Sequence, residues 1–88
     1  MMKCKLGDLV TPKNGKYNGE LFIVTSFVDQ DYCLIVNGKQ RKLSNPKKKK
    51  VKHLLLLAEN ASLEQKLQNN AYVLDSDIVK LISKYKNK

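Results

Sequence analysis

The sequence predicts a mainly β protein, in which a small barrel of five strands is followed by one or two C-terminal α-helices. Residues 21–28 are rich in apolar and β-branched side chains, which an extended chain divides between two faces. Similar short runs, separated by Gly, Asn, Asp or Pro, follow one another up to about residue 57. An apolar stripe with helical spacing appears near the C-terminus. We therefore expect one domain, with a barrel over residues 1–57 and a helical extension over residues 58–88 that packs on it.

The first two expected strands enclose a loop rich in lysine and glycine. The first strand covers residues 9–11, and Pro12 ends it because proline has no N–H to donate to the strand ladder. The loop covers residues 12–19, and the second strand covers residues 21–28. We expect a positive φ angle at Gly19, because glycine adopts that conformation at no steric cost.

The third and fourth expected strands flank a hairpin signal. Residues 29–31 form a polar turn, and residues 32–36 form the third strand. Asn37-Gly38 favours a two-residue type I′ turn between two strands. The fourth strand is therefore expected over residues 39–43.

A run of four lysines separates the fourth expected strand from the fifth. Residues 44–46 contain a proline and stop the fourth strand. Repulsion between like charges argues against regular structure over residues 47–50. Residues 51–54 resume the β conformation and would close the barrel, and the apolar run of residues 54–57 supplies a seat for the C-terminal extension.

The C-terminal segment carries two helix signals. Ser62 and Gln65 have the spacing of a capping box, in which each side chain meets the backbone N–H of the other residue. Asp75 or Ser76 would cap a second helix. This second helix has an amphipathic stripe at spacings of three, four and seven residues, formed by Ile78, Leu81, Ile82 and Tyr85.

Net charge is the strongest compositional signal. The chain holds 17 Lys or Arg and 8 Asp or Glu residues, which gives a net charge of +9. Most of the excess lies in residues 1–53, so the expected barrel and its exit are basic and a polyanion is the expected partner. Lysines bind phosphates as mobile point charges and give affinity without sequence readout.

Several other classes of function lack their usual signals. The sequence has no apolar run long enough for a transmembrane helix and no signal-peptide pattern, so a cytoplasmic protein without membrane contact is expected. Cys4 and Cys33 form no C-x-x-C pair and are expected to be reduced thiols. His53 is the single histidine. We therefore expect no catalytic residues, no metal, no cofactor and no small-molecule substrate.

The loop and its flanking strands resemble the KOW motif of small SH3-like barrels. Later landmarks follow in an order similar to that of the KOW domain of an archaeal and eukaryotic large-subunit ribosomal protein family, and of the short bacterial KOW-domain RNA-binding proteins related to it. These landmarks are Asp29 to Tyr32, Cys33 to Gly38, Arg41 to Leu43, Pro46 to Lys48, and His53-Leu54. The resemblance covers residues 5–57, and residues 58–88 have no part in it. It implies an SH3-like barrel that binds RNA.

The resemblance also implies particular contact residues. The family's loop pattern is matched by Lys13, Gly15, Lys16 and Gly19. Its basic exit is matched by Arg41, Lys42, Pro46, Lys47, Lys48 and His53. The loop departs from the usual Lys-Gly pair because Asn18 precedes Gly19, which removes one positive charge.

We therefore expect a ribosome-associated or ribosomal-protein-like chain that binds structured ribosomal RNA. The expected RNA-binding residues are Lys13, Asn14, Lys16, Tyr17, Lys39, Arg41, Lys42, Lys47, Lys48, Lys49, Lys50, Lys52 and His53. Tyr17 either stacks on an unpaired base or lies back on the barrel. Two alternatives remain open: a protein-interaction module of the transcription or translation machinery, and a general nucleic-acid-binding module.

Overall fold

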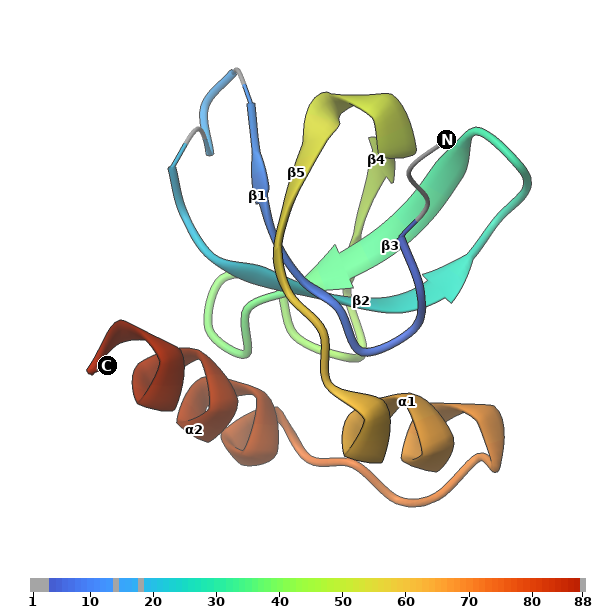
Figure 1. The fold of residues 1–88 in the computed structure, drawn as a ribbon, viewed down its shortest axis with the longest axis vertical. Coiled ribbons are helices and arrows are strands. Elements are labelled where there is room, and N and C mark those ends of the chain that lie inside the picture. The colour runs from blue at the N-terminus through green and yellow to red at the C-terminus, as the bar shows by residue number, and fades with distance from the viewer. Residues whose placement is uncertain (1–3, 14, 18, 88) are drawn as a thin grey trace.

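The computed structural model describes residues 4–13, 15–17 and 19–87, which form a five-stranded antiparallel sheet and two helices (Figure 1). The strand order is β4-β3-β2-β1-β5. The small, mainly β, barrel-like fold with two C-terminal helices is confirmed. The elements are β1 (Leu9–Pro12), β2 (Phe22–Phe27), β3 (Tyr32–Val36), β4 (Lys47–Lys50), a 3₁₀ turn (Val51–His53), β5 (Leu54–Ala58), α1 (Ala61–Gln68) and α2 (Asp75–Lys86).

The curved sheet buries side chains on both of its faces. Alternate residues point to opposite sides of a strand, so Phe22 and Val24 of β2 enter the barrel while Ile23 points outward. The inner cluster of buried residues contains Cys4, Val10, Phe22, Val24, Cys33, Ile35 and Leu54. The outer cluster of buried residues contains Leu9, Ile23, Val36, Leu63, Ile78 and Ile82.

The two C-terminal helices cover the outer face of the sheet, and Figure 1 shows both on the same side of it. Leu63 of α1 and Ile78 and Ile82 of α2 supply their buried side chains. Asp75 fixes the start of α2, because its carboxylate accepts a 2.7 Å hydrogen bond from the backbone N–H of Leu43. The amphipathic stripe expected in this segment therefore forms the contact between helix and sheet.

The first three strands lie close to their expected positions. β3 has the expected bounds, and β2 is one residue shorter at each end. Pro12 is the last residue of β1, paired with Leu54 of β5. Gly19 has a φ angle of +85°, which confirms the expected backbone conformation. The pairing of β2 with β3 shifts register between Val24 and Ser26, which marks a β-bulge.

The expected fourth strand is wrong. Residues 39–43 lie in a loop, and the lysine run that was expected to be irregular forms β4. Asn37 prevents a two-residue hairpin, because its side-chain oxygen accepts hydrogen bonds from the backbone N–H groups of Lys39 and Arg41. Pairing with β3 stabilises the strand conformation of the lysine run. Repulsion between neighbouring lysines is reduced because successive side chains point to opposite faces of the sheet.

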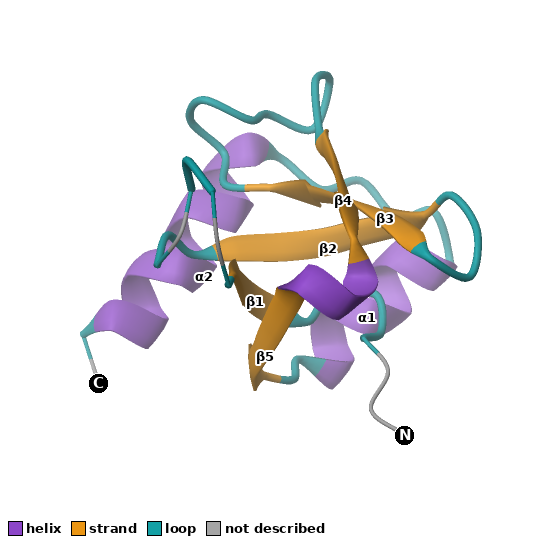
Figure 2. Cartoon of the chain, turned by 90° about the horizontal axis from the view of Figure 1, so that it is seen from above, coloured by secondary structure: helices purple, strands orange, loops and turns teal. Residues whose placement is uncertain are grey.

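The last strand begins later than expected. Residues 51–53 form the 3₁₀ turn rather than a strand, and Figure 2 shows this turn joining β4 to β5. β5 then pairs antiparallel with β1. Leu54 lies opposite Pro12 at one end of this pairing, and Ala58 lies opposite Leu9 at the other. The described strand pairs place β4 and β5 at the two ends of the sheet, so the 3₁₀ turn connects these ends.

Both predicted helix caps are wrong. Asn60 rather than Ser62 caps α1, because its side-chain oxygen accepts a hydrogen bond from the Leu63 N–H at 3.0 Å. At the start of α2, the carboxylate of Asp77 accepts from the Leu74 N–H at 3.0 Å. Asp75 contacts the β3–β4 loop instead of capping its own helix.

Cys4, Cys33 and Asp8 are buried titratable groups of the described residues. Cys4 and Cys33 are free thiols in the inner cluster. Burial raises the pKa of Cys4, and it raises the pKa of Cys33 to about 12. Asp8 is 1% exposed, and its carboxylate accepts a 2.7 Å hydrogen bond from the Lys5 N–H. Burial raises the pKa of Asp8 because it penalises the charged form.

Candidate nucleic-acid interface

The strand conformation of β4 divides its four lysines between two faces of the sheet. Lys47 and Lys49 pair with Ile35 and Cys33, whose side chains lie inside the barrel. Lys48 and Lys50 pair with Leu34 and Tyr32 and leave on the other face. The run that looks like one patch in the sequence therefore forms an inner pair and an outer pair of lysines.

The inner pair meets the β1–β2 loop. The Lys47 Nζ lies 5.5 Å from the centroid of the Tyr17 ring, and the Lys16 Nζ lies 5.7 Å from it. A side chain built at Gly15 would place its Cβ 3.8 Å from the Lys49 Nζ, so Lys49 also reaches this loop. We call Lys16, Tyr17, Lys47 and Lys49 the loop–strand cluster. It concentrates three ammonium groups where the loop approaches β4.

Tyr17 lies back on the barrel within this cluster. Its half-buried ring makes an edge-to-face contact with Phe22, with centroids 5.5 Å apart and planes at 83°. The two lysines beside the ring gain cation–π attraction. A base would therefore have to displace a lysine from the ring before it stacked there, and the ring serves first to position the ammonium groups.

The outer pair of lysines shares a different aromatic ring. The Nζ atoms of Lys48 and Lys50 lie 5.0 and 5.8 Å from the Tyr32 centroid. The turn that precedes Tyr32 carries the carboxylates of Asp29 and Asp31. These carboxylates offset positive charge at the start of β3, so the outer pair is a weaker candidate for binding phosphates than the loop–strand cluster.

Three further expected contact residues border the loop and the 3₁₀ turn. The backbone N–H of Lys13 donates to the His53 carbonyl oxygen at 2.8 Å and ties the β1–β2 loop to the turn. The side chains of Lys13 and Lys52 are exposed, and His53 is half-buried. Asn14, also expected to contact RNA, lies outside the described residues.

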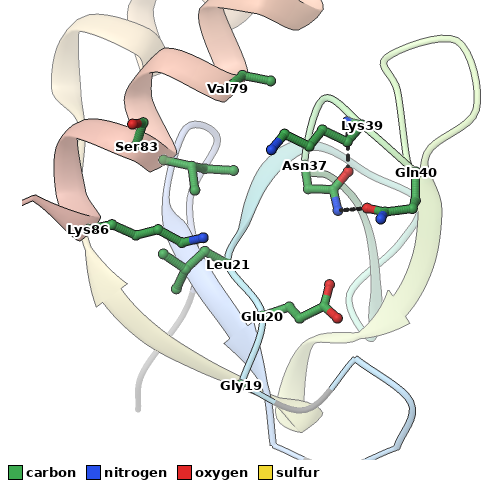
Figure 3. Close-up of a pocket in the computed structure, with 10 residues that line it drawn as sticks. Gly19, Glu20, Leu21, Asn37, Lys39, Gln40, Val79, Ser83 and Lys86 are labelled. Carbon is green, nitrogen blue, oxygen red and sulfur yellow. Dashed lines mark hydrogen bonds between the residues drawn. The ribbon is translucent and has the colours of Figure 1, made fainter.

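The remaining expected residues belong to the β3–β4 loop, which packs against α2. Arg41 is half-buried, while Lys39 and Lys42 are exposed. Lys39 lines a cavity with residues of α2 and of the segment that precedes β2, including Lys86 and Glu20 (Figure 3). The sequence grouped Lys39 with the lysine run, whereas the fold places it at this separate cavity.

Sequence reasoning missed two residues that the fold brings to these sites. The sequence places Tyr32 only in the third expected strand. Its pairing with Lys50 could not be predicted, because it requires the lysine run to be a strand. Lys86, at the C-terminal end of α2, is not among the expected RNA-binding residues. A signal for Lys86 exists in its spacing of four residues from buried Ile82, which places both side chains on one face of α2.

No helix in the described part of the chain has the length and apolar character needed to cross a membrane. Among the same residues, no group of three or more His, Cys, Asp or Glu side chains has the arrangement of a metal site. No protein-family model matches the chain, and no curated protein matches it. The resemblance to the KOW family therefore stays a prediction.

Proposed function

We propose that this protein is a cytoplasmic RNA-binding protein that docks on structured RNA through the loop–strand cluster. The observation that carries the proposal is the convergence of lysines from two separate elements: Lys16 and Lys47 lie beside the Tyr17 ring, and Lys49 reaches the same loop at Gly15. Two ammonium groups held beside one ring, with a third at the same loop, offer phosphates more fixed positions than lysines on a disordered tail do. The net charge of +9 adds long-range attraction to any nucleic acid.

Ribosomal RNA is the target that we propose, because the sequence resembles KOW domains of ribosomal proteins over residues 5–57. The chain contains one arginine, so it can make few bidentate contacts to guanine bases. The shape of the RNA and the spacing of its phosphates would therefore select the site. In this proposal the barrel holds the β1–β2 loop and β4 at a fixed separation, and the protein carries out no chemistry on the RNA.

Two double variants test the proposal because they remove the same charge from the same strand. Lys47→Gln/Lys49→Gln removes the inner pair, and Lys48→Gln/Lys50→Gln removes the outer pair. Binding to a structured ribosomal RNA fragment is measured by fluorescence anisotropy at salt concentrations from 50 to 200 mM. Each lost phosphate contact flattens the log–log salt slope by about one unit, so we expect a change of about two units for the inner pair and less than one for the outer pair.

Unchanged melting temperatures of both variants serve as the control for folding. Equal effects of the two pairs would show that total charge rather than the loop–strand cluster determines affinity. Full affinity in both would mean that the lysines only solubilise the protein. Binding to duplex DNA as tight as to RNA would favour a general nucleic-acid-binding module, and binding that resists high salt would favour a protein partner.

A further inference from the structure

A cavity of about 400 Å³ lies between the β3–β4 loop, the segment before β2 and α2 (Figure 3). Lys39 reaches into it from the loop, and Lys86 reaches into it from the last turn of α2. Leu21 and Ile82 supply apolar parts of the wall, and Glu20 supplies a carboxylate. The volume falls within the range of roughly 300–1,000 Å³ that is usual for small-molecule sites.

The loop side of this cavity is held in place by hydrogen bonds. The Asn37 oxygen accepts from the Lys39 and Arg41 N–H groups at 2.9 and 3.0 Å. The Asn37 amide nitrogen donates to the Gln40 side-chain oxygen at 2.9 Å, as Figure 3 shows. This bond orients the Gln40 amide and leaves its nitrogen to donate to a ligand. Because this wall is already ordered, ligand binding would cost little conformational entropy in the loop.

The loop that carries Lys39 also packs directly against α2. Gly38 lies so close to α2 that an added Cβ would stand 2.7 Å from the Val79 Cγ2 and 2.8 Å from the Asp75 carbonyl oxygen. The hydrogen bond from the Leu43 N–H to the Asp75 carboxylate anchors the same loop to the first turn of the helix. The separation between Lys39 and Lys86 is therefore set by backbone packing as well as by their own side chains.

We propose that this cavity holds one nucleotide, with its phosphate between the Lys39 and Lys86 ammonium groups. The base lies on the apolar wall at Leu21 and Ile82, the Gln40 amide donates to the base edge, and the Glu20 carboxylate accepts a hydrogen bond from a ribose hydroxyl. The required chemistry is that of a 5′-phosphorylated ribonucleoside. It is supplied by a nucleotide within bound RNA or by a free mononucleotide.

The path of the chain favours a nucleotide within bound RNA, an assignment that rests on the proposed function. Tyr17 of the loop–strand cluster and Glu20 of the cavity are joined by a turn, because the Glu20 N–H donates to the Tyr17 carbonyl oxygen at 3.0 Å. Gly19, between them, borders open space, with no heavy atom within 4 Å of an added Cβ. The cluster and the cavity are therefore adjacent along this short stretch of the chain, so that one RNA strand can occupy both.

Two double variants of equal charge separate a site in this cavity from general electrostatic binding. Lys39→Gln/Lys86→Gln removes both ammonium groups of the cavity. Lys66→Gln/Lys80→Gln removes two exposed lysines of α1 and α2 that do not line it. Each protein is titrated with uridine and adenosine 5′-monophosphates, with inorganic phosphate and with a single-stranded RNA pentanucleotide, while backbone amides are followed by NMR.

We expect both mononucleotides to shift the amide signals of Lys39, Gln40 and Ser83 in the native protein and in the control variant, and to leave them unshifted in the cavity variant. The cavity variant should bind the pentanucleotide about tenfold more weakly, with a salt slope flatter by about 1.4 units. Inorganic phosphate should bind at least tenfold more weakly than either mononucleotide. Equal affinities for inorganic phosphate and for the mononucleotides would show that the proposed contacts to the nucleoside are wrong.

The titrations also separate failure of this inference from failure of the proposed function. If no nucleotide shifts the amide signals of the cavity while Lys47→Gln/Lys49→Gln weakens RNA binding, the cavity is not a nucleotide site and the proposed function stands. If mononucleotides shift the cavity signals but RNA does not bind, the cavity takes a free nucleotide and the proposed RNA function is wrong.

Discussion

Two glycines with the same backbone conformation stand in different surroundings. Gly19 and Gly38 have φ angles of +85° and +82°, which disfavour any residue with a side chain. Space around Gly19 is open, whereas a Cβ at Gly38 would overlap Val79 and the backbone of Asp75. The spacing of the loop indicates the need for glycine at position 19. The need at position 38 arises from a helix about forty residues away and is invisible in the local sequence.

The first prediction compares alanine at these two positions. Gly19→Ala should lower the free energy of unfolding by about 1–3 kcal/mol, the usual penalty for a strained backbone conformation. Gly38→Ala adds overpacking against α2 and should lose a further ~1–3 kcal/mol. Urea unfolding followed by circular dichroism measures both values. Equal losses would show that the loop moves away from α2 at no energetic penalty.

A second prediction at this scale concerns pH. Burial raises the pKa of Asp8 above its ordinary value of 3.8, so the folded state binds a proton more tightly than the unfolded state does. The stability that Asp8 contributes is therefore fully present below pH 3.8 and is lost as the pH rises through the raised pKa. Asp8→Asn retains an oxygen that can accept from the Lys5 N–H, and its stability does not depend on this titration.

Melting temperatures of the native protein and of Asp8→Asn between pH 3 and 7 provide the measurement. The melting temperature of the variant should rise relative to that of the native protein as the pH rises, because the neutral Asn side chain avoids burying a charge. A constant difference across this range would mean that Asp8 titrates at its ordinary pKa in the folded protein.

At the scale of elements, the hairpin signal and the lysine run explain where sequence reasoning succeeds and fails. Asn37-Gly38 does reverse the chain, but hydrogen bonds that the Asn37 side-chain oxygen accepts from the Lys39 and Arg41 N–H groups widen the turn into a loop. Charge repulsion argues against a lysine strand only while the strand is considered alone. Pairing with β3 supplies hydrogen bonds, and its alternating geometry separates the charges. β2 and β3 were predictable because their own composition matches their burial.

A third prediction concerns the helices as covers for the sheet. Truncation after Ala58 keeps every strand but exposes Leu9, Ile23 and Val36, which are now buried under α1 and α2. A large apolar patch on a small protein promotes association, so the truncated chain should aggregate at concentrations where the full chain is monomeric. Light scattering and size-exclusion chromatography test this expectation. A soluble, monomeric and fully stable fragment would show that the sheet does not need its cover.

For the whole molecule, composition alone does not predict where the lysines gather. The excess of lysine in residues 1–53 indicates a polyanion, and the fold does bring Lys16, Lys47 and Lys49 together. Lys39 instead joins Lys86 at a cavity that requires α2 to be in place. Such a pairing depends on tertiary packing between residues far apart in the chain, and no local pattern encodes it.

The position of β4 at one end of the sheet has a consequence for colloidal behaviour. An end strand offers unpaired backbone groups to other molecules, and its lysines oppose such pairing by mutual repulsion. A polyanion that neutralises these lysines weakens that repulsion. In the RNA complex that we propose, solubility should therefore be lowest where the RNA charge balances the protein's +9, and excess RNA should restore solubility by reversing the sign of the net charge.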